Sequence, residues 1–576
     1  MLAAVEDGRE RAAWTWILEH MEAYPTGPTV RRLQPLRPPT RPEKGRRMVA
    51  AHFVTAPDPE GGVPVPTALL WTAGMMPKRV VLDLESGAAE KVAAALFTDT
   101  HRGALIAFPD GAVQAFAVML RRYARTWVRL GYTIEPLVAG AAIKALLIRR
   151  ARHSWALCDL DTMTGLKGFT EATFVATFGT ASPSPVTALH SALVGWQKMS
   201  LEHFDAAAGV TVGRSAIRAA ARNLGEQSWL WRPLPLAVAM LRSGGGYRGG
   251  YAVARRYTGP AWAMDLNKAY LWALGEPMPL RAGVTTALGG HDAPPGAYLS
   301  RVEGSGLAPL FLGVWREDGG GFDRVVWHGG DALAVLTMTE TAAVRRLGYR
   351  VTVGRGIVYG STFTLRGFVA QVAGITRMYG RGSAQERIAK AYGNTVYGKL
   401  AERPDREQVM YALDSPGEGW SAYVDNTGTE IADLWAKRGV AYRSHQHIDA
   451  ASEVTANVRA RLYDAIGTVV RAGGEVPQAD TDGFLSSIDP SGLFDTDLTA
   501  PGAWRPAQGP QRAIVWGRRG YAFGEDVHAA GLSGVSAAMA DQAMAGEAVG
   551  VNMQVRAGAF GSGPLYQSTR RMVRAV

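Results

Sequence analysis

Cysteine is almost absent from this chain of 576 residues, in which Cys158 is the one example. A single cysteine excludes a disulfide framework and a cysteine-based zinc site within one chain. Disulfide-rich proteins belong to oxidising compartments, so this usage fits a reducing one. We therefore expect a cytoplasmic protein.

Long apolar runs are also missing. The most apolar stretch, PLVAGAAIKALLI at residues 136–148, is short and contains Lys144, so we expect no membrane span. Residues 1–24 mix charges into their apolar positions. That pattern is typical of an amphipathic helix and not of a signal peptide.

Acidic residues are the minority charge: 51 Asp and Glu stand against 62 Lys and Arg, a net charge of +11. Such an excess favours a polyanionic partner, and nucleic acid is the commonest one. Hydrophobic residues make up 47% of the chain and charged residues 20%, as in ordinary globular proteins. The length is sufficient for several domains.

Composition shifts divide the chain. Residues 31–47 are rich in Pro and Arg, which is typical of an extended arm. From residue 48 to about 200, strand-like runs alternate with helical periodicity, as in an α/β domain, and residues 184–224 look helical. A glycine cluster at 241–252 then marks a junction.

The second half of the chain predicts an α+β region with an antiparallel sheet. Its short strand-like runs are separated by helical stretches at 365–379, 383–401 and near 451–472. Residues 404–447 are polar and irregular in pattern, and we expect them to form an insertion.

Two aspartates, Asp480 and Asp482, stand one residue apart in PQADTDGFLSS (residues 477–487). The simplest interpretation is a polar hairpin turn, because Asp, Thr and Gly all suit turns. On a strand, residues i and i+2 share a face, and paired carboxylates need a cation or hydrogen bonds to offset repulsion and desolvation. The pattern alone leaves both interpretations open.

A third aspartate, Asp265, interrupts the apolar strand pattern of residues 260–274. A buried carboxylate is costly unless it is neutralised. Magnesium prefers carboxylate oxygens and is usually held by one or two of them with substrate phosphates. Asp265 and Asp482 on two strands of one sheet could bridge two such ions, which would activate an attacking hydroxyl and stabilise a leaving pyrophosphate.

The segment GNTVYGKL (residues 393–400) has the glycine and lysine spacing of a P-loop. A P-loop also needs Ser or Thr where Leu400 stands, and a strand in front, whereas the preceding residues are helical in composition. A P-loop NTPase is therefore only a minor alternative.

As a helix, the same region places Arg387, Lys390, Asn394 and Tyr397 on one face. Two cations, an amide and an aromatic ring suit a nucleoside triphosphate. A solvated basic face with a packing tyrosine is the alternative.

Five segments in order resemble motifs of family B DNA polymerases. DLNKAY (265–270) resembles motif A, KAYGNTVYG (390–398) motif B and DTD (480–482) motif C. YRGG (247–250) is similar to the Tyr-x-Gly-Gly junction of the protein-primed subgroup. RRGYAF (518–523) is similar to its Lys-x-Tyr motif, with Arg519 in the lysine place.

The resemblance implies a role for each motif. Asp265 and Asp482 would hold two Mg²⁺ ions, with Mn²⁺ as an alternative, and Asp480 would support them. Tyr270 would exclude a ribose 2′-OH. The dNTP would be bound by Arg387, Lys390, Asn394 and Tyr397. DNA would be bound by Tyr247, Arg248, Gly249 and Gly250 on the template side and by Arg519 and Tyr521 on the primer side.

The resemblance also implies a right-hand polymerase built of α+β and α/β domains. A helix and basic arm (1–47) would precede an RNase H-like exonuclease-type domain (48–240). The palm would comprise residues 241–364, with a priming-type insertion, and 448–500. The fingers would be 365–403, a second insertion 404–447 and the thumb 501–576. We expect a monomer whose partners are DNA template, primer and dNTPs, and, in the protein-primed mode, a terminal priming protein.

Four residues depart from the usual motifs. Lys268 stands at a serine position and Leu271 at a proline position of motif A. Ala479 stands at an aromatic position and Gly483 at a serine position of motif C. None of them removes a metal ligand, so they bear on nucleotide affinity and fidelity.

The family's proofreading exonuclease needs four carboxylates to hold two metals. Asp83 and Glu85 match its first motif, AFPDGAVQAF (107–116) matches the second weakly, and His190 stands near the place of the last aspartate. Asp159 and Asp161 fit strand-end structure better than a metal site. We therefore predict an exonuclease-like fold that has lost proofreading.

Together the motifs predict a template-directed DNA polymerase that replicates phage or plasmid DNA. It would add dNMPs to a 3′-OH, or to a hydroxyl of a priming protein, by two-metal nucleotidyl transfer. The alternatives are a non-catalytic nucleic-acid-binding protein on a decayed polymerase scaffold and the P-loop NTPase.

Overall fold

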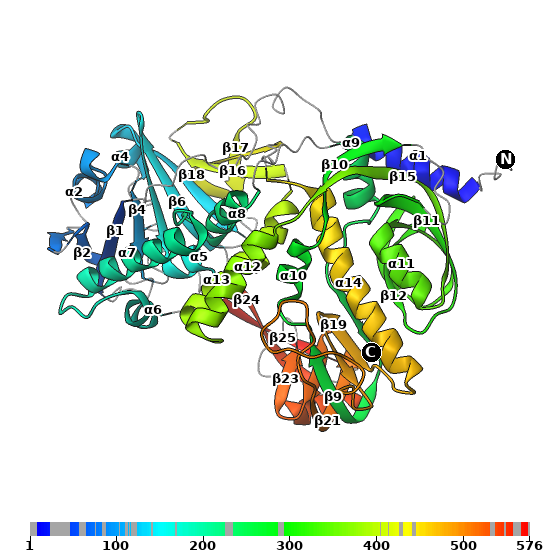
Figure 1. Cartoon of the computed structure of the whole chain (residues 1–576). Coiled ribbons are helices and arrows are strands. Elements are labelled where there is room, and N and C mark those ends of the chain that lie inside the picture. The colour runs from blue at the N-terminus through cyan, green and yellow to red at the C-terminus, as the bar shows by residue number, and fades with distance from the viewer. Residues whose placement is uncertain are drawn as a thin grey trace.

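The computed structural model (Figure 1) describes residues 8–22, 47–56, 65–74, 76–82, 88–102, 104–109, 113, 116, 124–139, 142–166, 170–224, 234–285, 293–318, 320–403, 405–412, 414–424, 430–440, 445–529, 536–545, 549–556 and 566–573. In these residues helices and five sheets alternate, which confirms a mixed α and β fold. None of the helices described is long and apolar enough to cross a bilayer.

Residues 48–224, here called the N-terminal unit, are built on a seven-stranded sheet of order β3-β2-β1-β4-β7-β6-β5. β1 is parallel to β4 and β4 to β7, while the outer pairs are antiparallel. The strands are β1 (Met48–Ala56), β2 (Val65–Thr72), β3 (Lys78–Val81), β4 (Leu105–Phe108), β5 (Thr133–Ala139), β6 (Ala142–Arg150) and β7 (His153–Asp159). The predicted α/β pattern is confirmed here.

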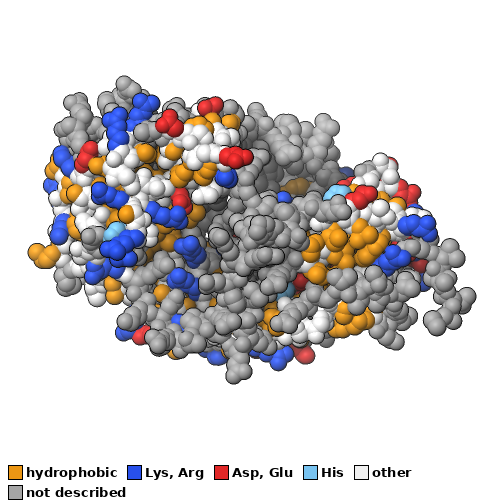
Figure 2. Space-filling view, turned by 90° about the horizontal axis from the view of Figure 1, so that it is seen from above, with side chains coloured by type: hydrophobic (Ala, Val, Ile, Leu, Met, Phe, Trp, Pro, Cys, Tyr) orange, Lys and Arg blue, Asp and Glu red, His pale blue; other side chains and the backbone are white. Residues whose placement is uncertain are grey.

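Within the described residues of the N-terminal unit, two α-helices lie between the strands of this sheet in sequence, and four more follow β7. They are α2 (Ala88–Leu96), α4 (Ala124–Arg129), α5 (Leu160–Thr164), α6 (Glu171–Phe178), α7 (Pro185–Phe204) and α8 (Val212–Arg222). α7 lies along β1 and buries Leu189, Leu193 and Trp196. Seen from above, Lys and Arg side chains are spread over the N-terminal unit (Figure 2).

Residues 405–440 do not form the irregular segment that we predicted. They contain β16 (Asp405–Tyr411), β17 (Ser421–Val424) and β18 (Glu430–Val440), paired antiparallel in the order β16-β18-β17. Val409, Tyr411 and Leu434 join the apolar core of the N-terminal unit. Polar residues alternate with these apolar ones, so the composition looks polar although the strand period of two is present.

The second seven-stranded sheet has the order β23-β22-β21-β9-β20-β19-β8, and all its pairs are antiparallel, as predicted. Its strands are β8 (Tyr251–Ala254), β9 (Tyr257–Asp265), β19 (Gln478–Thr481), β20 (Gly483–Ser486), β21 (Gln508–Gly517), β22 (Gly520–Phe523) and β23 (Asp526–Ala529). The first part of the predicted 501–576 domain is thus continuous with the sheet that carries the aspartates.

A six-stranded sheet of order β10-β15-β11-β14-β12-β13 lies beside the long helix α14 (Ile448–Arg471). It comprises β10 (Met278–Thr285), β11 (Gly296–Gly304), β12 (Leu310–Arg316), β13 (Gly321–Trp327), β14 (Gly330–Thr337) and β15 (Arg350–Phe363), with α11 (Met338–Arg346). The predicted N-terminal helix is α1 (Gly8–Glu22). It packs Trp14 and Ile17 against this sheet and against α9 (Pro235–Val238) and the π-helix η3 (Ala239–Ser243).

The helical hairpin α12 (Arg366–Tyr379) and α13 (Ala384–Leu400) joins the two halves of the molecule (Figure 1). Phe204 of α7 packs against Phe368 of α12 and Tyr392 of α13, and α10 (Ala269–Gly275) packs on the other side. The segment 393–400 lies inside α13, so the P-loop interpretation is wrong. The chain ends in α15 (Ala537–Met544), β24 (Val549–Arg556) and β25 (Tyr566–Val573).

Candidate active site

Two aspartates meet at the end of neighbouring strands. β9 ends at Asp265, and Gly483 of β20 lies opposite it in register. The Leu266 N–H donates to the Asp482 carbonyl at 2.7 Å. Asp480 pairs with Gly483, so Thr481 and Asp482 form the turn of the β19–β20 hairpin, and Thr481 is left-handed with φ 63°. The segment is therefore a hairpin turn and at the same time part of a carboxylate site.

Burial raises the proton affinity of both carboxylates, and Asp265 adds to the effect on Asp482. Burial, followed by the charge of Asp265, raises the pKa of Asp482 to about 7. Burial also raises the pKa of Asp265, against the opposing effect of Arg505. A half-buried pair of like charges is stabilised by a cation, and two carboxylates with space for phosphate oxygens are the donors that Mg²⁺ prefers. In the described residues, His, Cys, Asp and Glu do not gather in groups of three or more able to hold a metal.

Arginines already neutralise part of this charge. Arg505 Nη1 lies 2.7 Å from Asp265 Oδ2, and the Arg505 N–H donates to the Asp265 carbonyl at 2.9 Å. Asp480 Oδ1 lies 3.3 Å from Arg519 Nε and accepts the Thr481 hydroxyl at 2.8 Å. Arg505 was not among the residues that the sequence indicated, because it lies in a loop with no motif.

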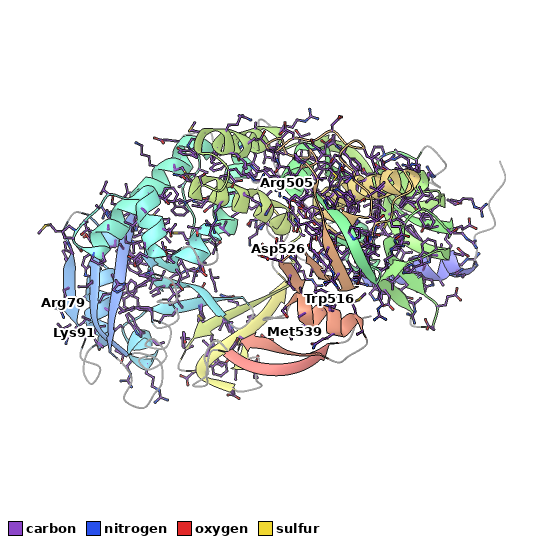
Figure 3. The ribbon with its side chains drawn as sticks, turned by 90° about the horizontal axis from the view of Figure 1, so that it is seen from below. Arg79, Lys91, Arg505, Trp516, Asp526 and Met539 are labelled. Atoms are coloured by element: carbon purple, nitrogen blue, oxygen red, sulfur yellow. The ribbon has the colours of Figure 1, made fainter. Side chains whose placement is uncertain are left out.

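The aspartates line an open cavity of about 520 Å³ between the strand ends and the β22–β23 hairpin. Arg505 and Asp526, labelled in Figure 3, both belong to its wall. Tyr521 stacks on His528 with ring centroids 4.6 Å apart. Burial raises the pKa of the Tyr521 phenol to about 12. The charged and phenolic lining comprises Asp265, Asp480, Asp482, Arg505, Tyr521 and Asp526.

Aromatic rings from motifs A and B lie face to face. Tyr270 of α10 stacks on Tyr397 of α13 with centroids 4.2 Å apart and planes 10° apart. Burial raises the pKa of both phenols, and Asp482 and Tyr247 lie close enough to add to the effect. The structure thus brings Tyr247, Tyr270 and Tyr397 together beside Asp482.

Cations from the α12–α13 hairpin face the aspartates. The charge of Lys390 opposes the rise in pKa that burial causes in Asp265 and Asp482, and Arg381 in the turn between the helices has the same effect on Asp265. Lys390, Asn394 and Arg387 are exposed on α13. Among the described cations, Lys390 and Arg505 act on both Asp265 and Asp482, Arg381 acts on Asp265, and Arg519 lies beside Asp480. The predicted role of Arg387 in binding the triphosphate stays a prediction.

The junction 247–250 lies directly against motif C. A Cβ at Gly250 would stand 2.8 Å from Thr481 Oγ1 and 2.9 Å from its Cα, so only glycine fits without movement, whereas a Cβ at Gly249 would meet nothing within 4 Å. Thr481 pairs with Tyr251 on β8. The junction is therefore packed against the hairpin that carries Asp482.

The prediction that Arg248 contacts DNA does not agree with the structure. Its side chain is 0% exposed and donates to the carbonyls of Gly245 and Val335, each at 2.9 Å, and to Glu340. Arg459 of α14 lies 3.0 Å from the same carboxylate and donates to the Arg248 carbonyl at 2.8 Å. A buried charge needs such partners, which turn this guanidinium away from the surface.

The four residues that depart from the usual motifs each have surroundings that suit the residue present. A Cβ at Gly483 would already lie 3.0 Å from the Met264 carbonyl, Ala479 is fully buried, and Leu271 packs against Gly393 of α13. Lys268 is buried and reaches both helices of the α12–α13 hairpin. Motif A is thus joined to α13 through two of its atypical residues.

Of the candidate exonuclease residues, Asp159 and His190 lie in the described part of the N-terminal unit. Asp83 and Glu85 lie outside the described residues. Asp159 ends β7 and accepts the Val113 N–H at 2.9 Å, as expected for strand-end structure. His190 belongs to α7, where burial lowers its pKa and the Met48 backbone of β1 binds it.

No protein-family model and no curated protein matches the chain. Solved structures do match. Phi29 DNA polymerase complexed with primer-template DNA and incoming nucleotide substrates superposes with a TM-score of 0.65 at 14% identity, over 93% of this chain and 100% of that one. This chain shares the fold of phi29 DNA polymerase.

Two further structures of phi29 DNA polymerase agree. The complex with single-stranded DNA gives a TM-score of 0.58 at 15% identity, over 85% of this chain and 93% of that one. The binary complex with primer-template DNA gives 0.59 at 15% identity, over 92% and 100%. The predicted resemblance to protein-primed family B polymerases is confirmed for the fold, and the roles of individual residues rest on the geometry above.

Proposed function

We propose that this chain is a template-directed DNA polymerase of the protein-primed, family B type. The observation that carries the proposal is the pairing of Asp265 with Asp482 beside Lys390 and the Tyr270–Tyr397 stack. Two carboxylates, a cation and an aromatic wall are what a metal-bound nucleoside triphosphate requires. The phi29 fold and the net charge of +11 support DNA as the partner.

In this proposal separate residues bind the metal ions, the triphosphate and the sugar of the nucleotide. Asp265 and Asp482 hold two divalent cations, which supply charge stabilisation for the attacking and leaving oxygens. Lys390 and Arg381 bind the triphosphate. Tyr270, stacked on Tyr397, lies under the sugar and rejects a 2′-OH.

The DNA strands follow the surfaces next to the aspartates. Tyr247, Gly249 and Gly250 meet the template strand, and Arg519 and Tyr521 the primer strand. The acceptor is the 3′-OH of a primer or the hydroxyl of a terminal priming protein. Residues 241–364 and 448–500 form the palm, 365–403 the fingers and 501–576 the thumb, of which β21–β23 are continuous with the palm sheet.

The N-terminal unit is proposed to keep an exonuclease-like fold without proofreading. Asp159 accepts the Val113 N–H and His190 binds the Met48 backbone, which supports structural roles for both residues. Extension of a mismatched primer with no excision of its 3′ end would support this part of the proposal. Metal-dependent excision that disappears on changing Asp83 or Glu85 would contradict it.

Primer extension tests the proposal directly. A primed single-stranded template is incubated with Mg²⁺ and four dNTPs, beside an Asp482→Asn control. Templated products that vanish in the control are expected. Because the protein-primed mode needs a separate hydroxyl donor, the assay is repeated with candidate priming proteins. Retained DNA binding without product in either format would indicate a non-catalytic binding protein.

A further inference from the structure

Lys268 follows Asp265 by three residues and occupies an unusual environment. Its backbone is left-handed, with φ 50° and ψ 48°, and the residue is 8% exposed. A non-glycine residue in this conformation is strained, and a buried ammonium is desolvated, so both persist only where the surroundings fix them. The groups that fix Lys268 come from α12 and α13.

The Lys268 ammonium contacts both helices of the hairpin. Nζ donates to the hydroxyl of Thr376 on α12 and lies 3.4 Å from Glu386 Oε1 on α13. The Thr376 hydroxyl in turn donates to the Val372 carbonyl at 3.2 Å. The side chain therefore points into the hairpin and not into the cavity of the aspartates.

Glu386 is itself held in place. It is 5% exposed, its N–H donates to the N-cap hydroxyl of Ser383 at 3.2 Å, and its Oε2 accepts the Gly382 N–H at 3.4 Å. One carboxylate thus fixes the turn between α12 and α13 and binds Lys268. Lys390 lies four residues further on, on the same face of α13.

The neighbours of Lys268 in motif A, Asn267 and Leu271, also contact other segments. Leu271 packs so closely on α13 that a Cβ at Gly393 would lie 2.9 Å from its Cδ1. Asn267 donates to the carbonyls of Leu498 and Ala500, at 3.2 and 3.1 Å, in the loop that leads to Arg505. Residues 267–271 therefore connect α13 on one side to the Arg505 loop on the other.

We propose that Lys268 is a positioning residue that fixes α13 relative to Asp265 through Glu386 and Thr376. It sets the distance between the triphosphate-binding Lys390 and the metal-binding aspartates, and it does not touch the nucleotide itself. This inference rests on the proposed polymerase function. A buried charge pair can hold such a register, since either member is costly to leave unpaired.

The test is single-nucleotide primer extension with the wild type, Lys268→Met, Glu386→Gln and the double variant. We expect each single change to raise the KM for dNTP about thirtyfold, the lower end of the effect seen when a buried charge pair loses one member. We expect kcat to change less and the Kd for primer-template DNA to stay constant. Because the two residues act as a unit, the double variant should be no worse than the more affected single variant.

Lys399→Met is the matched control. Lys399 lies on the same helix and pairs with Glu402 at 2.9 Å, away from motif A. An unchanged KM in Lys268→Met and Glu386→Gln, effects that multiply in the double variant, or an equal rise in Lys399→Met would each overturn the inference. If Lys268→Met does not fold, Thr376→Val removes one partner of the ammonium, and we expect a rise in KM of about threefold.

The result with the wild type distinguishes a failure of the proposed polymerase function from a failure of the proposed role of Lys268. Absence of templated extension by the wild type contradicts the proposed function. Extension by the wild type with an unaltered KM in the variants contradicts the role of Lys268 alone.

Discussion

The protonation of Asp482 affects how the candidate active site binds a metal ion. Burial and the neighbouring Asp265 oppose its negative charge and raise its pKa to about 7. A carboxylate must lose its proton before it binds a metal. Below pH 7 the proton and the metal therefore compete for the same oxygens.

We expect metal affinity to fall as the pH drops below 7. Each pH unit should weaken binding by up to about tenfold, because one proton must leave for each metal bound through Asp482. Titration calorimetry with Mn²⁺ at pH 6, 7 and 8, with primer-template DNA present, measures this. Asp482→Asn should bind more weakly and with a smaller pH dependence, because only Asp265 is left to titrate, and equal wild-type affinity at pH 6 and 8 would contradict the assignment.

Two adjacent glycines give a matched pair of substitutions. A Cβ on Gly250 would meet the Thr481 backbone at 2.9 Å, whereas one on Gly249 would meet nothing within 4 Å. Gly250→Ala should lower the free energy of unfolding by about 1–3 kcal/mol, the usual cost of overpacking. Gly249→Ala should lower it by much less, and urea denaturation of both variants shows whether the difference exists.

At the scale of elements, regular periodicity was the best guide. The helices at 366–379, 384–400 and 448–471 and the antiparallel strands around Asp265 follow their sequence patterns. β16–β18 did not, because alternate polar residues hide an apolar face that is completed only by the N-terminal unit. Local composition carries no information about a partner surface 250 residues away in the chain.

The long helix α14 begins at a buried histidine that makes the fold sensitive to acid. His447 Nδ1 accepts the Ala450 N–H at 3.4 Å, and Nε2 donates to the Leu280 carbonyl at 3.2 Å. Burial lowers the pKa of His447 to about 4. Between pH 6.5 and pH 4 the imidazole of His447 is thus protonated in the unfolded chain and neutral in the folded one. The folded state therefore loses stability as the pH falls through this range.

We expect the free energy of unfolding to fall by about 2 kcal/mol between pH 7 and pH 5 through His447 alone. His447→Asn keeps a capping side chain but cannot titrate, so the wild type minus the variant isolates this contribution. Urea denaturation of both proteins at pH 7 and pH 5 gives the difference. If that difference is the same at the two pH values, the assignment is wrong.

At the scale of the whole molecule, the site assembles residues that the sequence keeps far apart. The motifs predicted Asp265, Lys390 and Asp482, because their chemistry and order are visible in the chain. Arg505 and Arg381 could not be predicted, since their place beside Asp265 depends on how loops close over the sheet. The burial of Arg248 was hidden for the same reason: Glu340 and Arg459 approach it only in the folded chain.

DNA binding by the whole molecule should depend steeply on salt. A net charge of +11 favours release of counterions from the phosphate backbone. If six or so phosphates are contacted, the affinity for primer-template DNA should fall about 10³-fold between 50 and 200 mM salt. Fluorescence anisotropy over that range measures the slope, and a flat response would contradict a phosphate-dominated interface.

The union of β16–β18 with the N-terminal unit has a consequence for synthesis on the ribosome. Val409, Tyr411, Tyr423, Leu434 and Ala436 complete a core whose other members lie before residue 160. The nascent chain therefore emerges with that apolar surface uncovered until residue 440 has left the exit tunnel. At about 5–20 residues per second, the roughly 280 intervening residues take about 14–56 seconds. Over that interval the N-terminal unit, although it is made first, exposes apolar surface to which a chaperone could bind.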